Sequence, residues 1–112
     1  MGIRLDKPWN QRDTASRLSG QLGVYQLGDD SGEVLLIGYA GGRSRFGLRG
    51  EVESALERAL TATQYRVEIT TAYLTRFQEL LMLHQADYGT LPVLNDPVPG
   101  LGRLSPVPDR RA

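Results

Sequence analysis

Two β-rich runs and the turn between them decide the fold: Leu22-Gly-Val-Tyr-Gln-Leu27 and Glu33-Val-Leu-Leu-Ile-Gly38, separated by Gly28-Asp-Asp-Ser-Gly32. The runs are rich in β-branched, aromatic and other apolar residues, whereas the segment between them consists of residues that favour turns. Strands joined by so short a segment pair antiparallel, so the sequence predicts a β-hairpin. Alternation along the first strand puts Val24 on one face of the sheet and Tyr25 on the other.

The residues after the hairpin predict two helices and a third strand. Between residues 48 and 61, apolar residues recur at helical spacing, which predicts an amphipathic helix. Residues 65–70 alternate between apolar and polar side chains, as a strand does. Thr75-Arg-Phe-Gln78 has the pattern of a capping box, so a second helix is expected from there to about residue 88. Its apolar middle, Leu80-Leu-Met-Leu83, predicts cover on more than one side, including by a second subunit in a homodimer.

These elements together predict an α+β domain with a small three-stranded antiparallel sheet flanked by helices. Residues 1–21 are expected to form a lead-in with a short helix near residues 14–21, and residues 22–96 the domain itself. Residues 97–112 are rich in proline and poor in bulky side chains, which predicts a disordered tail. The whole chain of 112 residues is enough for one compact domain.

The composition excludes several classes of site. The chain has no Cys and one His, which removes disulfides, thiolate zinc sites and histidine metal cages. Thirteen basic residues balance thirteen acidic ones, so any affinity for nucleic acid must come from a local patch. No run approaches the roughly 20 apolar residues of a membrane helix, and the first residues lack the apolar core of a signal peptide. A cytoplasmic location without membrane contact is expected.

The segment 38–50 concentrates basic charge. It contains five glycines and three arginines and no acidic residue. Arg43, Arg45 and Arg49 offer planar donor groups that match phosphate oxygens, and the glycines let the backbone approach an anion. The segment therefore predicts contact with nucleic acid, and the alternative interpretation is a solvated loop.

The hairpin and the residues that follow it resemble the GIY-YIG nuclease domain. That family has Gly-Ile-Tyr on one strand and, ten or eleven residues later, Tyr-Ile-Gly on the next; here ten residues separate Gly23-Val-Tyr25 from Leu36-Ile-Gly38. The family also has an Arg in the first helix region, a Glu early in the next helix and an ending of the Pro-x-x-Asn type. The matching positions, within a resemblance that spans residues 22–95, are Arg45 or Arg49, then Glu79, then Leu91-Pro-Val-Leu-Asn95.

The resemblance implies hydrolysis of a phosphodiester with one divalent ion, Mg²⁺ or Mn²⁺. Glu79 would hold the metal, because a hard ion prefers a carboxylate, phosphate oxygens and water. Tyr25 would position or deprotonate the attacking water. Arg45 or Arg49 would stabilise the charge on the phosphate.

Departures from the family pattern leave other interpretations open. Leu36 stands where the family has its second tyrosine, which makes Tyr39 the candidate to replace it, and Asn95 is expected to hydrogen-bond backbone near the site. The lost tyrosine and the balanced charge are equally consistent with a catalytically inactive module of this fold that binds nucleic acid, a nucleotide or a protein partner. A fold with no inherited site would be favoured if Tyr25 and Glu79 lay on opposite faces of the sheet.

Overall fold

Seven elements follow one another in residues 5–95, the part of the chain that the computed structural model describes. In chain order they are strand β1 (Asn10–Gln11), 3₁₀ helix η1 (Arg12–Arg17), strands β2 (Gly23–Gly28) and β3 (Val34–Ala40), helix α1 (Gly47–Arg58), strand β4 (Gln64–Ile69) and helix α2 (Tyr73–Tyr88). The predicted α+β class is confirmed. The proline-rich tail expected at residues 97–112 lies outside the described residues.

An antiparallel sheet of four strands, in the order β1-β4-β2-β3, forms the centre of the fold. β2 pairs with β3 in the predicted hairpin and with β4 on its other side, so these three strands are confirmed. The expected total of three strands is wrong, because β1 pairs with β4 through Asn10 opposite Tyr65 and Gln11 opposite Gln64. Two residues are too few to show any alternation, so periodicity could not reveal β1.

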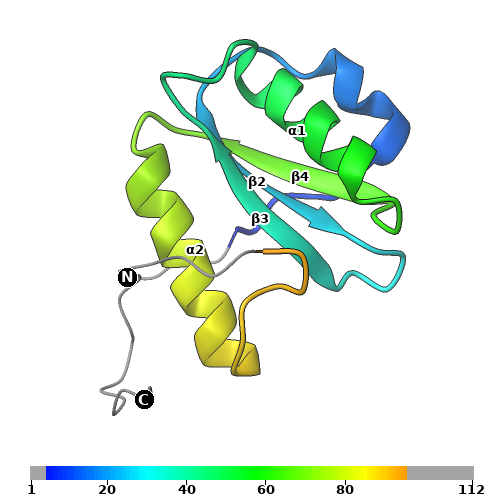
Figure 1. Cartoon of the computed structure of the whole chain (residues 1–112), viewed down its shortest axis with the longest axis vertical. Coiled ribbons are helices and arrows are strands. Elements are labelled where there is room, and N and C mark those ends of the chain that lie inside the picture. Colours follow the sequence, from blue (N-terminus) through cyan, green and yellow to red (C-terminus); the bar gives the residue numbers. More distant parts are fainter. Residues whose placement is uncertain (1–4, 96–112) are drawn as a thin grey trace.

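Helices cover both faces of the sheet (Figure 1). On the face covered by α1 and η1, the core includes Tyr25, Leu27 and Val52. On the face covered by α2, it includes Val24 and Leu80. The alternation predicted along β2 is therefore confirmed, and the two faces have separate hydrophobic cores.

Two helices begin earlier than predicted, the short one near residues 14–21 and the one expected from residue 75. The first helix is η1, which starts earlier than residue 14, and its Arg12 side chain donates hydrogen bonds to carbonyls at the end of α1. The capping box predicted at Thr75-Arg-Phe-Gln78 is wrong, because α2 already begins at Tyr73 and Ala72 precedes it without a side-chain cap. Tyr73 stacks on Tyr39 of β3, and this contact with the sheet accompanies the earlier start.

The apolar middle of α2 is only partly covered within residues 5–95. Leu80 and Leu81 are buried against the sheet, while Met82 and Leu83 remain half-buried. The homodimer expected from this segment stays a prediction. None of the described helices combines the length and the apolar character that crossing a bilayer requires.

Candidate functional site

A cleft of about 770 Å³ lies along β3 between the first turns of α1 and α2. Figure 1 shows β3 placed between these two helices. We call it the β3 cleft; its lining side chains that can hydrogen-bond or carry charge are Tyr25, Tyr39, Arg43, Ser44, Glu51 and Tyr73. They come from β2, β3, the loop after β3, α1 and α2, so the fold gathers them from most of the chain. The volume is in the range of sites for ligands of the size of a nucleotide.

Tyr25 reaches the cleft because its partner on β3 is a glycine. Gly38 is paired with Tyr25, and a Cβ atom at position 38 would lie 2.3 Å from the phenol oxygen. The Tyr25 side chain is only 5% exposed. Burial, and next the Glu51 carboxylate, raise the pKa of Tyr25 to about 12, while Arg58 acts in the opposite direction. At neutral pH the phenol is therefore protonated, and it can donate a hydrogen bond but is a poor base.

The loop of residues 41–44 is tied to both helices. The Ser44 N–H donates to the Gly41 carbonyl at 3.0 Å, and the Gly41 N–H donates to the Ser44 hydroxyl at 3.0 Å. The same hydroxyl donates to the Glu51 carboxylate of α1 at 2.7 Å. On the other side, the Gly42 N–H donates to the Tyr73 hydroxyl of α2 at 3.1 Å. These bonds fix the mouth of the β3 cleft between the two helices.

The α2 side of the cleft is a wall of aromatic rings. Tyr39 stacks on Tyr73 with ring centroids 5.7 Å apart and an interplanar angle of 16°. Phe77 contacts Tyr39 from a tilted position, with centroids 4.9 Å apart. Tyr39 remains 37% exposed, so the cleft offers part of an aromatic surface to a ligand. The structure thus places the predicted supporting residue Tyr39 in the same cleft as Tyr25.

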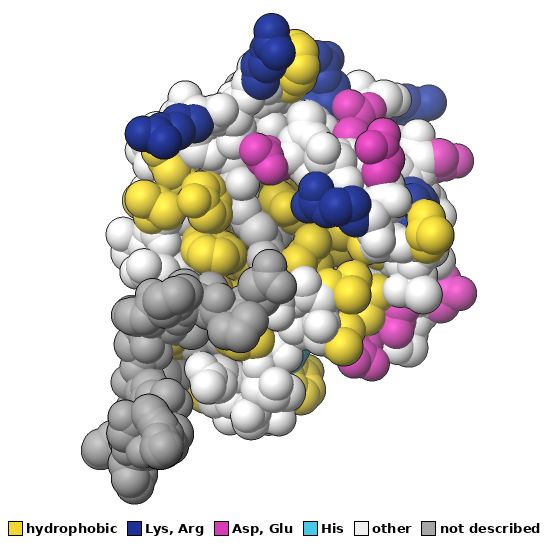
Figure 2. Space-filling view, viewed as in Figure 1, with side chains coloured by type: hydrophobic (Ala, Val, Ile, Leu, Met, Phe, Trp, Pro, Cys, Tyr) yellow, Lys and Arg dark blue, Asp and Glu magenta, His cyan; other side chains and the backbone are white. Residues whose placement is uncertain are grey.

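The three predicted arginines divide between two places. Arg43 lines the cleft, is exposed and forms no ion pair with any residue in the described range 5–95. Arg45 and Arg49 are not among the lining residues, and the guanidinium carbon of each lies 5.8 Å from the centre of the Phe46 ring. Figure 2 shows basic side chains gathered at the end of the molecule where α1 begins.

Glu79, the predicted metal ligand, is not brought to Tyr25. Tyr25 packs on the face of the sheet covered by α1, whereas Glu79 is part of α2 on the opposite face. This is the arrangement that favours a fold with no inherited site, and it separates Glu79 from the tyrosine with which the resemblance pairs it. The Glu79 carboxylate accepts a hydrogen bond from Arg76 at 2.5 Å, and Arg76 also pairs with Glu68 at 3.0 Å. Across residues 5–95, no three side chains from His, Asp and Glu gather where they could hold a metal ion.

Asn95 fastens the chain to the outer edge of β3. Its side-chain oxygen accepts from the Ile37 N–H at 2.8 Å, and its side-chain nitrogen donates to the Ile37 carbonyl at 2.9 Å. The Leu94 N–H donates to the Leu35 carbonyl at 3.0 Å. Asn95 thus hydrogen-bonds backbone of β3, and these bonds satisfy polar groups of a strand edge.

Sequence reasoning missed two polar groups of the cleft, Glu51 and Ser44. Glu51 looked like an ordinary acidic residue near the start of a helix, where the helix dipole favours it. Its side chain instead accepts the Ser44 hydrogen bond and faces the cleft. The position of Glu51 could have revealed its role, because Glu51 directly follows a glycine-rich segment, residues 38–50, that contains no acidic residue.

Comparisons with known proteins place the chain in a family. Neither the curated proteins nor the solved structures contain a match. Residues 3–87 match the family described as a domain of unknown function, DUF7508, and this match includes every residue that we name in the β3 cleft. Because the match covers well over half of the sequence, the chain belongs to the DUF7508 family.

Proposed function

We propose that the chain binds nucleic acid in the β3 cleft. One observation carries the proposal: an exposed cation, Arg43, stands in the same cleft as the partly exposed ring of Tyr39. A guanidinium and an aromatic surface in one cleft match the two chemical parts of a nucleotide, its phosphate and its base.

The cleft divides these tasks among its residues. Arg43 binds a phosphate through its donor fork, and no carboxylate among residues 5–95 forms an ion pair that competes for it. Tyr39 stacks on a base, supported from behind by Tyr73. The protonated Tyr25 phenol is a hydrogen-bond donor at the floor of the cleft. Since the net charge of the chain is zero, this local set supplies the affinity.

The sequence resemblance supports the same class of ligand. Gly23-Val-Tyr25 and Leu36-Ile-Gly38, the two segments that resemble the GIY-YIG nuclease domain, lie side by side on β2 and β3. Tyr25, Gly38 and Ile37 from these segments line the cleft. The two strand segments of the resemblance therefore supply part of the proposed site, whereas Arg45, Arg49 and Glu79 lie outside the cleft lining.

Fluorescence anisotropy tests the proposal. Labelled DNA and RNA, single-stranded and duplex, would be titrated with the wild type, Arg43→Gln and Tyr39→Leu. The matched control is Arg17→Gln, since Arg17 is exposed and lies outside the cleft lining. We expect Arg43→Gln to weaken binding and to reduce the salt slope by about 1, while Arg17→Gln changes neither. Equal effects of the two arginine variants would contradict the proposal.

A second candidate function is metal-dependent hydrolysis of the bound phosphodiester. The observation that favours it is that Tyr25 and a carboxylate, Glu51, line the same cleft. A single carboxylate fits Mg²⁺ or Mn²⁺ when phosphate oxygens and water complete the shell. Glu51 would hold the ion, which would polarise the phosphate when bound, and Tyr25 would orient water by hydrogen bonding.

Cleavage assays with two carboxylate variants test this second candidate. With Mg²⁺ or Mn²⁺ present, Glu51→Gln should abolish cleavage and Glu79→Gln should retain it, because Glu79 is paired with Arg76 on the other face. The opposite result would restore Glu79 as the metal ligand. If the wild type cleaves none of the substrates with either metal, the chain is a binding module only.

A further inference from the structure

We propose that Phe46, with Arg45 and Arg49, forms a second contact that selects unpaired nucleic acid. This inference rests on the proposed binding at the β3 cleft. We call the three residues the Phe46 knob. They follow directly on the cleft loop, in which Arg43 and Ser44 line the cleft. The knob is therefore the surface that a strand reaches if it leaves the cleft past Arg43.

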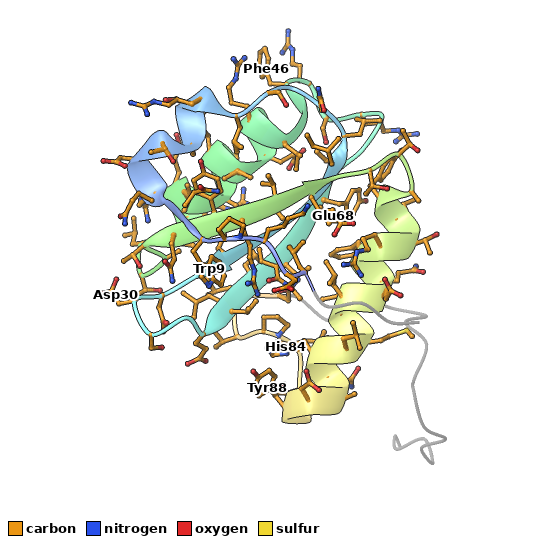
Figure 3. All side chains as sticks on the ribbon, turned by 180° about the vertical axis from the view of Figure 1, so that it is seen from behind. Trp9, Asp30, Phe46, Glu68, His84 and Tyr88 are labelled. Carbon is orange, nitrogen blue, oxygen red and sulfur yellow. The ribbon has the colours of Figure 1, made fainter. Side chains whose placement is uncertain are left out.

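Phe46 is a large apolar residue that does not contribute to either hydrophobic core. The side chain is 54% exposed and belongs to neither hydrophobic core cluster. Figure 3 shows Phe46 at one end of the molecule, at the opposite end from Tyr88. Phe46 directly precedes α1 without forming a side-chain cap, so a residue such as Ser or Asn would suit the helix better there.

The backbone that presents Phe46 is rigid. Gly47 has φ +59°, a conformation that favours glycine. A Cβ atom at this position would lie 2.1 Å from the Gly20 carbonyl oxygen, so only glycine fits where the two segments of backbone pass each other. The Leu48 N–H donates to the Gln21 carbonyl at 2.9 Å. Because the turn is fixed by contacts on both sides, the backbone that carries Phe46 is held in place before any ligand binds, which lowers the entropy that binding costs.

The charge around the ring is positive. The Arg45 and Arg49 guanidinium carbons each lie 5.8 Å from the ring centre, within the range of a cation–π contact. Neither guanidinium forms an ion pair with a carboxylate in residues 5–95. Two positive charges close to one exposed aromatic ring suit a partner that carries negative charge and also has a planar group that can stack.

Single-stranded nucleic acid is the partner that satisfies both requirements. The bases of a duplex stack on each other and leave phosphates on the outside, so a duplex would use the arginines but not the ring. An unpaired base offers a face on which Phe46 can stack once the arginines turn from the ring to the neighbouring phosphates. The knob therefore predicts a preference for single strands or for frayed ends over intact duplex.

Binding measurements with single-stranded and duplex oligonucleotides test the inference. Wild type, Phe46→Ala, Phe46→Tyr and Tyr88→Ala would be titrated with an oligothymidylate of about 20 nucleotides and with a duplex of equal length. Tyr88→Ala is the matched control, since Tyr88 is also an exposed aromatic residue but lies at the far end. Circular dichroism checks that all variants are folded.

We expect Phe46→Ala to weaken binding of the single strand roughly 5- to 100-fold, with less than about a twofold effect on the duplex, where the phosphate contacts carry the affinity. Phe46→Tyr should retain wild-type binding, because its ring still stacks, and Tyr88→Ala should have no effect. If wild type binds and Arg43→Gln weakens that binding while Phe46→Ala has no effect, the proposed contact at the Phe46 knob is wrong and the proposed binding in the β3 cleft stands.

If Phe46→Ala weakens binding of the single strand and of the duplex equally, the proposed preference for unpaired bases is wrong. If wild type binds neither, or binds only vesicles of anionic lipid, both proposals fail.

Discussion

Tyr25 and Gly38 show how a single pair of residues builds the floor of the cleft. The phenol lies across β3 at the place where any other residue at position 38 would put its Cβ atom. The burial that results raises the pKa of the phenol and keeps it protonated at neutral pH. The two residues therefore determine together whether the floor of the cleft contains the Tyr25 phenol as a hydrogen-bond donor.

Gly38→Ala should destabilise the fold by about 1–3 kcal/mol, because the added methyl group overlaps the Tyr25 ring. Urea denaturation measures the change. Gly42→Ala is the control from the same region, since the atom nearest to its Cβ would be the Tyr73 hydroxyl at an ordinary 3.7 Å. Equal stability of Gly38→Ala and wild type would show that the ring can move aside without cost.

The pH dependence of stability provides a second test of Tyr25. Because its pKa is raised to about 12 in the folded chain, the folded state binds more protons than the unfolded state above pH 10. The phenol's contribution is complete below its ordinary pKa near 10 and is lost as pH rises towards 12, by roughly 2–3 kcal/mol. Comparing wild type with Tyr25→Phe across pH 9–12 isolates this loss. Parallel curves for the two proteins would contradict the burial of the phenol.

The end of α1 is stabilised by a residue that is distant in the sequence, Arg12. Arg12 of η1 donates to three carbonyl oxygens near the end of that helix, those of Leu56, Ala59 and Ala62, at 2.5, 3.0 and 2.6 Å. A helix end leaves its last carbonyls without partners in the helix, and this guanidinium provides them. η1 is thus bonded to α1 and holds that helix in place over the sheet.

Arg12→Met should lower the free energy of unfolding by about 2–4 kcal/mol, since it leaves three partly buried carbonyls without this donor. The exposed Arg17 of the same element is the control, and Arg17→Met should change stability by less than about 0.5 kcal/mol. Chemical denaturation followed by circular dichroism gives both values. Similar losses for the two variants would mean that the Arg12 hydrogen bonds contribute little.

The elements that sequence reasoning predicted well are those with a strong local pattern. Turn-forming residues between two apolar runs marked the β2–β3 hairpin, and helical spacing marked α1. The same reasoning could not find β1 or the start of α2. β1 depends on its pairing with β4, and the first turn of α2 depends on Tyr73 packing against β3. Both are tertiary contacts that no local pattern encodes.

The site was predictable only in part, for a related reason. Tyr25 and Tyr39 were candidates through the resemblance to the GIY-YIG domain and Arg43 through the basic segment, and the cleft contains all three. Order along the chain does not specify which face of the sheet a helix covers. Glu79 therefore lies across the sheet from Tyr25, and Glu51 of α1 is the carboxylate found in the cleft.

At the scale of the whole molecule, the polar features of interest share one end. The starts of α1 and α2 and the loop of residues 41–46 meet beside β3, and basic side chains gather where α1 begins (Figures 1 and 2). His84 and Tyr88 lie towards the other end (Figure 3). A chain of zero net charge can attract a polyanion only through such a local concentration.

The central claim, that nucleic acid binds in the β3 cleft, is tested most directly by NMR. An unlabelled oligothymidylate would be titrated into ¹⁵N-labelled protein at low salt while the backbone amide signals are followed. We predict that the signals of Gly41, Gly42, Arg43 and Ser44 shift first and most. Shifts confined to the end of α2 near Tyr88, or no shifts at saturating oligonucleotide, would contradict the claim.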